Sequence, residues 1–465
     1  MQIRNPRSGK YDFTLTEMNR AEVQQLATTL RQAQDGWWRL GLAGRIEELR
    51  CFAEQLQLHK AALQHAVAED TGRWEESGLE VDVCVNNIRR WCHEAPELLA
   101  VAKPRSADIP FLQIQPDYLP FQLVGVISPW NFPLLLSLVD AIPALLAGSA
   151  VLIKPSEVTS RFVAPLQQAL QAVPTLQAVL GLVTGAGPTG QVLIEQVDTL
   201  CFTGSVATGK RVAQLCANLF IPAFLELGGK DAAIVCADAD LEAASSALCW
   251  GSMVNAGQSC MSIERIIVHE QVADQFIRLL VSKVQQLQHN YPDIQQGQVG
   301  PVISEKQLAV IQQQLDDARQ KGARFLCGGE LVELGGGSYC QPTVVDGVTP
   351  DMLLVTEETF AAIVVIQRAE SDAAAVAMAN NSRYGLSAAV FSKELPKAKA
   401  IAAQLHAGGI SINDACLTGF VHEAEKQSFR SSGMGGSRMG AESIRRFIRK
   451  KSFIINTGVA SPWWF

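Results

Sequence analysis

Short apolar runs alternate with amphipathic segments along most of this chain, and that alternation restricts its fold more than any other feature. Runs with the length and composition of buried strands lie at 124–128, 150–153, 181–183, 199–202 and 232–235. Segments with helical patterning separate most of them. Strands that alternate with helices form parallel sheets covered on both faces, so the sequence predicts an α/β fold with a doubly wound parallel sheet.

A second alternating series begins near residue 244 and indicates a second α/β unit. Its predicted strands lie at 263–268, 344–345, 363–366, 387–391 and 409–412, with a long helix ending near residue 287. Residues 17–70 have helical periodicity and are expected to form a helical opening. A chain of 465 residues should form two or three domains, and the cleft between two α/β units is a common ligand site.

Two strand-like segments, 110–124 and 446–457, belong to neither series. We expect them to pair as a small extra sheet used for association with another copy of the chain. The chain ends in Trp463-Trp464-Phe465, which is too apolar for a free terminus. We therefore expect this tail to cover the mouth of a tunnel, either its own or a neighbour's.

Composition excludes several classes of partner. The net charge of −7 argues against a nucleic acid or an anionic membrane. The longest apolar stretch, 132–153, contains Asp140 and two prolines, which favours a buried helix entering a strand over a membrane span. An odd count of eleven cysteines without metal-ligand spacing indicates a reducing compartment and no metal site. Since no signal peptide pattern is present, we expect a cytoplasmic protein.

One cysteine and one glutamate lie in glycine-containing loops and suggest covalent catalysis. Cys260 ends the run Asn255-Ala-Gly-Gln-Ser-Cys260, and Glu226 lies in Leu225-Glu-Leu-Gly-Gly-Lys230. A thiol among small, turn-forming residues is a candidate nucleophile, and a lone carboxylate in a second loop is a candidate base. The other ten cysteines mostly have apolar neighbours and are expected to be buried.

Asn131 is a candidate oxyanion donor. It lies in Pro129-Trp-Asn-Phe-Pro133, directly after a predicted strand. An amide held between aromatic rings and prolines is well placed to donate a hydrogen bond to a developing negative charge. The alternative interpretation is a rigid turn without a chemical role.

Two glycine-rich segments resemble phosphate-binding loops. Gly185-Ala-Gly187-Pro-Thr-Gly190 matches a dinucleotide fingerprint but lacks the acidic residue expected about twenty positions later, so an ordinary turn is the alternative. The segment 204–211 resembles a P-loop, but Arg211 stands where a Mg²⁺-binding Ser or Thr is required. A helix that starts after Gly204-Ser205 would still favour a pyrophosphate.

A third segment, Lys154-Pro-Ser-Glu157, ends a predicted buried strand. The Glu157 carboxylate could accept hydrogen bonds from a ribose diol, with Lys154 donating beside it. The alternative interpretation is a helix start capped by Ser156.

Six of these motifs occur together, in order, and they identify a family resemblance. They are Pro129-Trp-Asn-Phe-Pro133, Lys154-Pro-Ser-Glu157, Phe202-Thr-Gly-Ser205, Leu225-Glu-Leu-Gly-Gly-Lys230, Gly257-Gln-Ser-Cys260 and Glu357-Glu-Thr-Phe360. Their order and spacing resemble those of the NAD(P)-dependent aldehyde dehydrogenases over nearly the whole chain.

The resemblance implies a Rossmann-like cofactor-binding domain, an α/β catalytic domain and a small β oligomerisation element. We assign 1–101 and 121–228 to the dinucleotide-binding domain, 229–428 to the catalytic domain, and 102–120 with 443–465 to oligomerisation. A homodimer or homotetramer is expected.

The resemblance also implies the chemistry of the site. The substrate aldehyde would form a thiohemiacetal on Cys260, with its oxyanion held by Asn131 and the Cys260 backbone N–H. Loss of hydride to NAD or NADP would give a thioester, and Glu226 would activate the water that releases a carboxylic acid. The implied cofactor-binding residues are Ser128, Pro129, Trp130, Lys154, Ser156, Glu157, Gly187, Phe202, Thr203, Gly204, Ser205, Leu227, Gly228, Glu358 and Phe360. Among these, the carboxylate of Glu157 would repel a 2′-phosphate and favour NAD.

The chain departs from the family pattern in two loops. Ala361-Ala362 follow the Glu-x-Phe motif where many members have Gly-Pro, and Glu425-Lys-Gln-Ser428 replaces the usual Pro-Phe-Gly-Gly. Some members carry a Lys at Asp140 and a Glu at Ser437 that help to move protons. Their loss implies another proton exit, and Asp140 is either a cap-like surface residue or part of that path.

The substrate side has a mainly aliphatic lining. Leu135, Leu136, Val139, Val254 and Met261 are expected to line the tunnel, with 414–417 in a variable loop. Since no Arg is evidently placed to hold a substrate carboxylate, medium-chain aliphatic or aromatic aldehydes are favoured over semialdehydes such as succinate semialdehyde. Other functions considered are transfer of the thioester to coenzyme A, which the presence of a base disfavours, and a catalytically idle protein.

Overall fold

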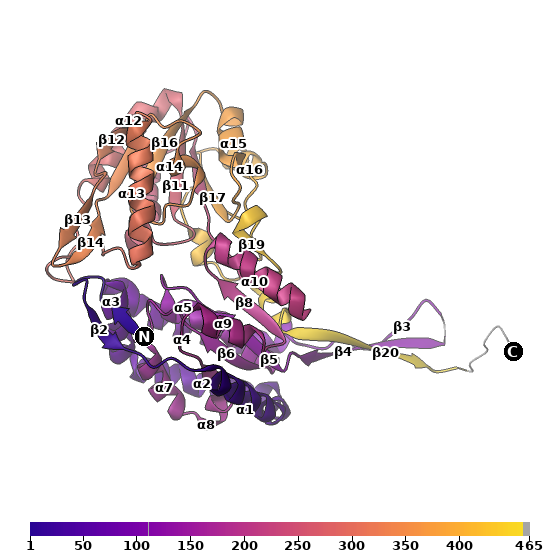
Figure 1. Ribbon diagram of the computed structural model, residues 1–465. Coiled ribbons are helices and arrows are strands. Elements are labelled where there is room, and N and C mark those ends of the chain that lie inside the picture. Colours follow the sequence, from indigo (N-terminus) through magenta and orange to yellow (C-terminus); the bar gives the residue numbers. More distant parts are fainter. Residues whose placement is uncertain (110, 459–465) are drawn as a thin grey trace.

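The N-terminal part of the chain is helical, as its periodicity predicts. The protein was analysed as a computed structural model, which describes residues 1–109 and 111–458 (Figure 1). The opening helices are α1 (Arg20–Arg39), α2 (Gly41–Leu58), α3 (Lys60–Thr71) and α4 (Glu75–Leu98). Helix α1 begins in a capping box, because Asn19 accepts from the Glu22 N–H and the Glu22 carboxylate accepts from the Asn19 N–H.

The first sheet has six strands in the order β19-β9-β8-β5-β6-β7, and all pairs except β19–β9 are parallel. Its strands are β5 (Leu123–Ile127), β6 (Ala150–Lys154), β7 (Leu180–Leu182), β8 (Thr199–Thr203), β9 (Ala223–Glu226) and β19 (Gly433–Met434). The helices between them are α5 (Pro133–Leu138), α6 (Ala141–Ala147), α7 (Val163–Gln171), α8 (Pro174–Gln177), α9 (Gly187–Ile194) and α10 (Val206–Leu219). This sheet and the opening helices share one apolar core.

The second sheet has seven strands in the order β12-β15-β16-β11-β10-β17-β18, with only β12 antiparallel to its neighbour. Its strands are β10 (Asp231–Val235), β11 (Ile263–His269), β12 (Arg324–Cys327), β15 (Thr343–Asp346), β16 (Ile363–Ala369), β17 (Ser387–Phe391) and β18 (Gly409–Ile412). The helices are α11 (Leu241–Met253), α12 (Glu270–Val284), α13 (Glu305–Gln320), α14 (Leu353–Thr356), α15 (Asp372–Asn380) and α16 (Leu395–Ala402).

The two sheets confirm the predicted α/β class, with one correction. The run 232–235, grouped above with the first series, forms β10 and lies inside the second sheet between β11 and β17. Apolar content alone predicts a buried strand but does not say which sheet it joins. The chain passes from one sheet to the other through the four residues between Glu226 and Asp231.

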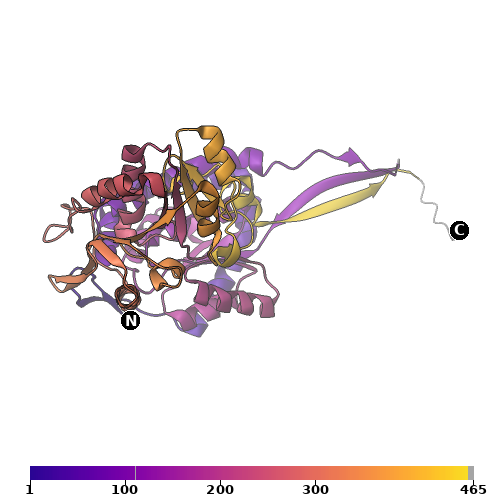
Figure 2. The ribbon, with the colours of Figure 1, turned by 90° about the horizontal axis from the view of Figure 1, so that it is seen from above.

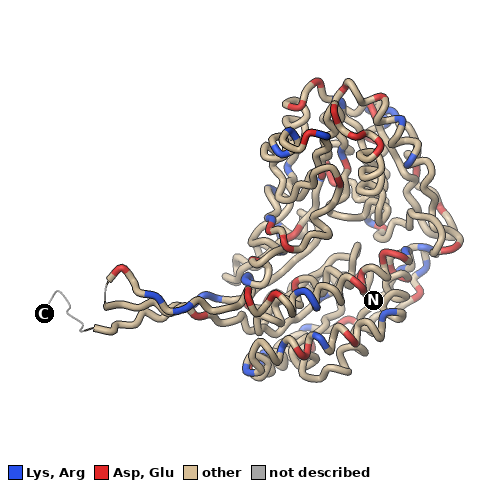
Figure 3. The backbone as a smooth tube through the Cα atoms, turned by 180° about the vertical axis from the view of Figure 1, so that it is seen from behind, with Lys and Arg blue, Asp and Glu red and all other residues tan. Residues whose placement is uncertain are grey.

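A three-stranded antiparallel arm extends away from both sheets (Figures 1 and 2). Its strands are β3 (Arg105–Ser106), β4 (Leu112–Pro120) and β20 (Ile448–Asn456), so the two strand-like segments pair as predicted. Basic residues lie along the arm together with fewer acidic ones, and residues of both charges are spread over the body (Figure 3). The tail at 463–465 lies outside the described residues.

The remaining elements are short. They are β1 (Gln2–Arg4), β2 (Tyr11–Thr14), β13 (Leu331–Leu334), β14 (Gly337–Cys340), α17 (Gly440–Arg445) and the 3₁₀ turns η1 (Val254–Gly257), η2 (Leu417–Gly419) and η3 (Arg430–Ser432). No helix within 1–109 and 111–458 is long and apolar enough to cross a membrane.

Asp140 is buried in an ion-pair cluster, which shows that the surface interpretation was wrong. Its side chain is 1% exposed, and its two oxygens contact Arg438 and Arg446, each at 2.8 Å. Burial alone would raise the pKa of Asp140, but the two guanidinium groups outweigh it and lower the pKa below its usual value. The carboxylate therefore ties the C-terminal segment to α6, and both of its oxygens are already bound.

Replacing Asp140 with Asn should leave two buried guanidinium groups without their counter-charge. We expect Asp140→Asn to lower the free energy of unfolding by about 3–5 kcal/mol, measured by denaturant unfolding. Because the folded-state pKa lies below the unfolded value, this stabilisation is present at neutral pH and is lost as the pH falls below about 4. Asp35→Asn breaks an exposed pair with Arg39 and should cost less than about 1 kcal/mol. Equal losses in the two variants would contradict this account.

Candidate active site

A cleft of about 540 Å³ lies where the carboxyl ends of the first sheet's strands face the second sheet's loops. The turns after β5, β8 and β9 meet the segment before β11 and the segment before β16. Ligands bind at this edge of open α/β sheets. The cleft brings together many of the predicted residues: Pro129, Trp130, Asn131, Thr203, Gly204, Ser205, Glu226, Leu227, Gly228, Cys260, Glu358 and Phe360.

The loop before Cys260 has an unusual backbone. Asn255, Ala256 and Gly257 all have positive φ, between 53° and 69°. A Cβ on Gly257 would lie 2.0 Å from the Ala361 oxygen, so only glycine fits there. The buried Gln258 side chain then anchors the loop, because it donates to the Pro301 oxygen and accepts from the Ile303 N–H.

Asn131 lies against this loop. Its Nδ2 donates to the backbone carbonyl oxygen of Gln258 at 3.0 Å, and the Asn131 side chain is nearly fully buried. Since an amide nitrogen carries two N–H groups, one remains to donate to an oxyanion near Cys260. Asn255 donates to the same carbonyl at 2.9 Å, which adds a contact that the sequence did not single out.

The Cys260 thiol lies at the base of the cleft and is half-buried. The pKa of Cys260 is raised to about 12, mainly by burial; the Lys426 ammonium opposes this shift, and the carboxylates of Glu358, Asp231 and Glu226 add to it. The thiol is therefore neutral at pH 7 in this arrangement, and its attack requires loss of the proton. Eight of the other ten cysteines are buried as predicted, while Cys51 is exposed and Cys327 is half-buried.

Glu226 ends β9 and borders the cleft. Its Oε2 accepts a hydrogen bond from the Ser428 hydroxyl at 2.6 Å. Ser428 belongs to the stretch that departs from the family pattern. Sequence reasoning identified the departure but not the contact.

The start of α10 has the features of a phosphate site. Ser205 caps this helix by accepting from the Thr208 N–H, and Gly204, Ser205, Val206 and Ala207 border the cleft. Helix N-termini attract phosphate through free N–H groups and the helix dipole. The residues present therefore fit a dinucleotide pyrophosphate at the position that the sequence predicts.

Other predicted cofactor residues do not border the cleft. Ser128 is buried and its hydroxyl pairs with Ser137 at 2.7 Å, Phe202 packs in the core, and Gly187 begins α9 in an exposed position. Ser156 accepts from the Val158 N–H in a turn, so the expected capped helix is absent there among the described residues.

Lys154 is the last residue of β6 and Glu157 lies in the turn that follows; neither residue borders the cleft. The Lys154 ammonium lies 3.3 Å from a Glu157 carboxylate oxygen that is itself partly exposed. Burial lowers the pKa of Lys154, which the Glu157 carboxylate opposes. The pair thus presents a fixed carboxylate and a buried ammonium to any group bound there.

A buried carboxylate that sequence reasoning missed holds the segment 358–360. Glu264 accepts from the Thr359 N–H at 2.8 Å and from the Phe360 N–H at 2.8 Å, and it pairs with the buried Lys230 ammonium at 2.5 Å. Phe360 has a positive φ of 56° and packs edge-on against Trp130. Glu264 follows the cysteine motif by four residues, but nothing in its sequence context indicated this partner.

Glu358 borders the cleft beside this network. Burial raises the pKa of Glu358 to about 8, with Glu264 adding to the effect, while the Gly229 N–H that it accepts at 3.2 Å lowers the pKa. A Cβ on Gly228 would lie 2.2 Å from the Glu358 carboxylate. Glycine at 228 is therefore required for the carboxylate to lie where it does.

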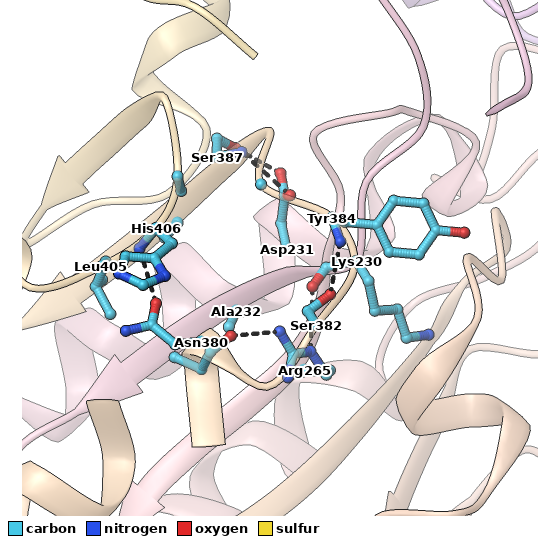
Figure 4. A pocket seen from close by; sticks show the side chains of 14 residues that line it. Lys230, Asp231, Ala232, Arg265, Asn380, Ser382, Tyr384, Ser387, Leu405 and His406 are labelled. Carbon is cyan, nitrogen blue, oxygen red and sulfur yellow. Dashed lines mark hydrogen bonds between the residues drawn. The ribbon is translucent and has the colours of Figure 1, made fainter. Parts of the chain in front are cut away.

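A small polar pocket lies behind this loop, at the start of β10 (Figure 4). Asp231 points toward Ser387 there, and its carboxylate accepts from the Ser387 hydroxyl at 2.5 Å and from its N–H at 3.2 Å. Burial raises the pKa of Asp231 to about 7. The pocket holds about 20 Å³, which is room for one water molecule and not for a substrate.

The substrate side is only partly as predicted. Leu136 borders the cleft, whereas Cys416 is buried and contacts the Met261 oxygen through its Sγ at 3.1 Å. Ser437 accepts from the Lys426 N–H at 3.0 Å and lies outside the cleft lining. Sequence reasoning missed further lining residues: Gln307, Val310, Gln313, Gln314, Leu353, Glu357, Arg383 and Tyr384. No cluster of metal-ligating side chains is present in the described ranges.

Comparison with known proteins finds similar proteins over nearly the whole chain. A model of the aldehyde dehydrogenase family matches residues 1–453. The chain is 33% identical over 425 residues to a Mycolicibacterium smegmatis protein assigned as a succinate-semialdehyde dehydrogenase [NADP(+)], covering 91% of this chain and 82% of that one. It is 32% identical over 464 residues to the vanillin dehydrogenase of Pseudomonas fluorescens, covering 98% and 94%.

Solved structures are similar over the whole chain. PutA of Anabaena variabilis, assigned as an aldehyde dehydrogenase, has a TM-score of 0.98 and 49% identity, covering 100% of this chain and 99% of that one. The betaine aldehyde dehydrogenase of Staphylococcus aureus in complex with NAD+ has a TM-score of 0.94 and 29% identity, covering 100% and 93%.

Replacing Glu264 with Gln should loosen the segment 358–360, because Lys230 loses its counter-charge and two backbone N–H groups lose a charged acceptor. We expect Glu264→Gln to raise the KM for the dinucleotide about tenfold, since hydrogen bonds to charged groups contribute about 1.5–3 kcal/mol. Initial rates at varied dinucleotide measure this. Glu242→Gln removes an exposed partner of Lys283 and should leave that KM unchanged. An unchanged KM in Glu264→Gln would refute the role.

Proposed function

Because the chain belongs to the aldehyde dehydrogenase family, an NAD(P)-dependent oxidoreductase family, we propose that Cys260, Asn131 and Glu226 carry its reaction. The single observation that carries this proposal is the convergence of the three side chains on one cleft, from three separate segments of the chain. Their chemistries are those of a nucleophile, an oxyanion donor and a base.

In this proposal the Cys260 thiol loses its proton to solvent, and the resulting thiolate attacks the aldehyde carbon to form a thiohemiacetal oxyanion. The Asn131 amide and the Cys260 N–H donate to the oxyanion, where one donor is typically worth about 3 kcal/mol of barrier. A dinucleotide held by the start of α10 and by the segment 358–360 would supply the acceptor for the hydride that leaves the thiohemiacetal carbon. Glu226 then takes a proton from the water that attacks the resulting thioester, and the carboxylic acid and the Cys260 thiol are released.

The substrates proposed are medium-chain aliphatic or aromatic aldehydes. Leu136 gives the cleft an aliphatic side next to Asn131, and the lining Arg383 is already paired with Glu357 and the Tyr384 hydroxyl. The Arg383 guanidinium therefore already has hydrogen-bond partners, one of them in the segment 357–360. The relative from Mycolicibacterium smegmatis is named as a succinate-semialdehyde dehydrogenase, which supports a semialdehyde such as succinate semialdehyde as the alternative substrate.

Transfer of the thioester to coenzyme A is the alternative reaction. Glu226 in the cleft favours water as the acyl acceptor, because hydrolysis of the thioester needs a base to activate water. Transfer of the acyl group to the thiol of coenzyme A does not need Glu226.

The arm formed by β3, β4 and β20 is proposed to associate with another copy of the chain, as a homodimer or homotetramer. Exposed apolar residues on the arm support this: Ile109, Phe111, Leu119, Phe453, Ile454 and Ile455.

Absorbance at 340 nm tests the reaction with a panel of aldehydes such as hexanal, benzaldehyde and succinate semialdehyde. We expect NADH formation without coenzyme A, no turnover in Cys260→Ala, and a retained hydride burst with slow steady-state turnover in Glu226→Gln. A rate that depends on coenzyme A would favour the acylating alternative. Absence of signal with every aldehyde would exclude the proposed reaction.

The preferred dinucleotide is proposed to be NAD⁺. The partly exposed Glu157 carboxylate would repel a 2′-phosphate, while the buried Lys154 is already paired with it. We expect Glu157→Ser to lower the KM for NADP⁺ and to raise the KM for NAD⁺, measured by initial rates with each dinucleotide. A lower KM for NADP⁺ than for NAD⁺ in the unmodified protein would contradict this preference.

A further inference from the structure

The C-terminal segment places a hydroxyl directly on the proposed base. The Ser428 Oγ lies 2.6 Å from the Glu226 Oε2, although the two residues are 202 positions apart in the sequence. The contact therefore depends on how the C-terminal segment packs against the first sheet. Ser428 is half-buried, between the exposed Gln427 and Phe429.

The backbone around Ser428 is fixed to the same strand that carries Glu226. Strand β19 pairs with β9 so that Gly433 lies opposite Glu226, and the Leu227 N–H donates to the Ser432 oxygen at 2.8 Å. A Cβ on Gly433 would lie 2.6 Å from the Ser428 Cβ, so Ser428 folds back closely over β19. The carboxylate is thus held at the end of β9, and the hydroxyl lies in the loop that packs against β19 beside it.

This contact has a direct consequence for the carboxylate. A serine hydroxyl donates one hydrogen bond, which occupies one oxygen of Glu226 and leaves the other to accept a proton from water. A hydrogen bond to a charged acceptor is stronger than one between neutral groups. It therefore limits the rotamers that the long glutamate side chain would otherwise sample.

Two other residues that depart from the family pattern, Asp140 and Ser437, already have hydrogen-bond partners of their own. Both Asp140 oxygens bind Arg438 and Arg446, and the Ser437 hydroxyl binds the backbone of Lys426 and Met439. Neither group is placed to orient Glu226. Ser428, which stands where the family pattern has glycine, supplies the contact instead.

We propose that Ser428 is a positioning residue that fixes the Glu226 carboxylate for hydrolysis of the thioester. This proposal rests on the proposed role of Glu226 as the base. Ser428 itself exchanges no proton with the substrate, and it acts only through the orientation of the carboxylate.

A double-mutant cycle tests the proposal in the full-length enzyme. The variants are Ser428→Ala, Ser428→Gly, Ser432→Ala and Glu226→Gln, and the double variants combine each serine substitution with Glu226→Gln. Ser432→Ala is the structural control because its buried hydroxyl accepts from the Gly385 N–H. With NAD⁺ and a limiting amount of hexanal, stopped-flow absorbance gives the rate of hydride transfer. Acid quenching followed by mass spectrometry gives the rate at which the acyl-enzyme disappears.

We expect both Ser428 variants to slow acyl-enzyme hydrolysis about tenfold without changing the hydride step, which matches the loss of one charge-assisted hydrogen bond. In the Glu226→Gln background the same substitutions should change hydrolysis less than about twofold. Ser432→Ala should reduce stability and show no coupling to Glu226. Unchanged hydrolysis in both Ser428 variants, or equal slowing in both backgrounds, would overturn the positioning role. Unchanged hydrolysis in Glu226→Gln alone would instead overturn the assignment of the base.

Discussion

The close approach of the loop 255–260 to the segment 358–362 is the constraint on which the rest of the site depends. Gly257 lies so near the Ala361 oxygen that a Cβ would reach 2.0 Å from it, and its two predecessors also have left-handed backbone. This geometry presents the Cys260 thiol to the cleft. The same contact joins the thiol to the loop that Glu264 holds, so the proposed nucleophile and the proposed cofactor-binding segment are positioned together.

The C-terminal segment is the second support of the site. It crosses from the second sheet back to the first, where β19 pairs with β9 beside Glu226. A few residues later Arg438 and Arg446 close around Asp140 on the first sheet's side. The C-terminal segment therefore joins the two sheets, and Ser428, from the stretch that departs from the family pattern, contacts the proposed base.

Much of the fold followed from local sequence, because strand length and apolar content are local properties. The strands near 263–268 and 387–391, and the cleft with Cys260, Glu226 and Asn131, lie where the pattern and the motifs placed them. Which strands pair, and which side chains bind each other, is not determined by local sequence. The sheet that β10 joins, the burial of Asp140 and the support from Glu264 depend on contacts across 95 residues or more, or on neighbouring strands, which periodicity does not encode.

The central claim is that the substrate's acyl group becomes bonded to Cys260 before water releases it. Intact-mass analysis of Glu226→Gln, quenched in acid after mixing with NAD⁺ and benzaldehyde, tests it directly. The account predicts a mass increase equal to one benzoyl group less one hydrogen, mapped by peptide digestion to Cys260. A covalent adduct on another cysteine, or none while NADH is formed, would contradict it.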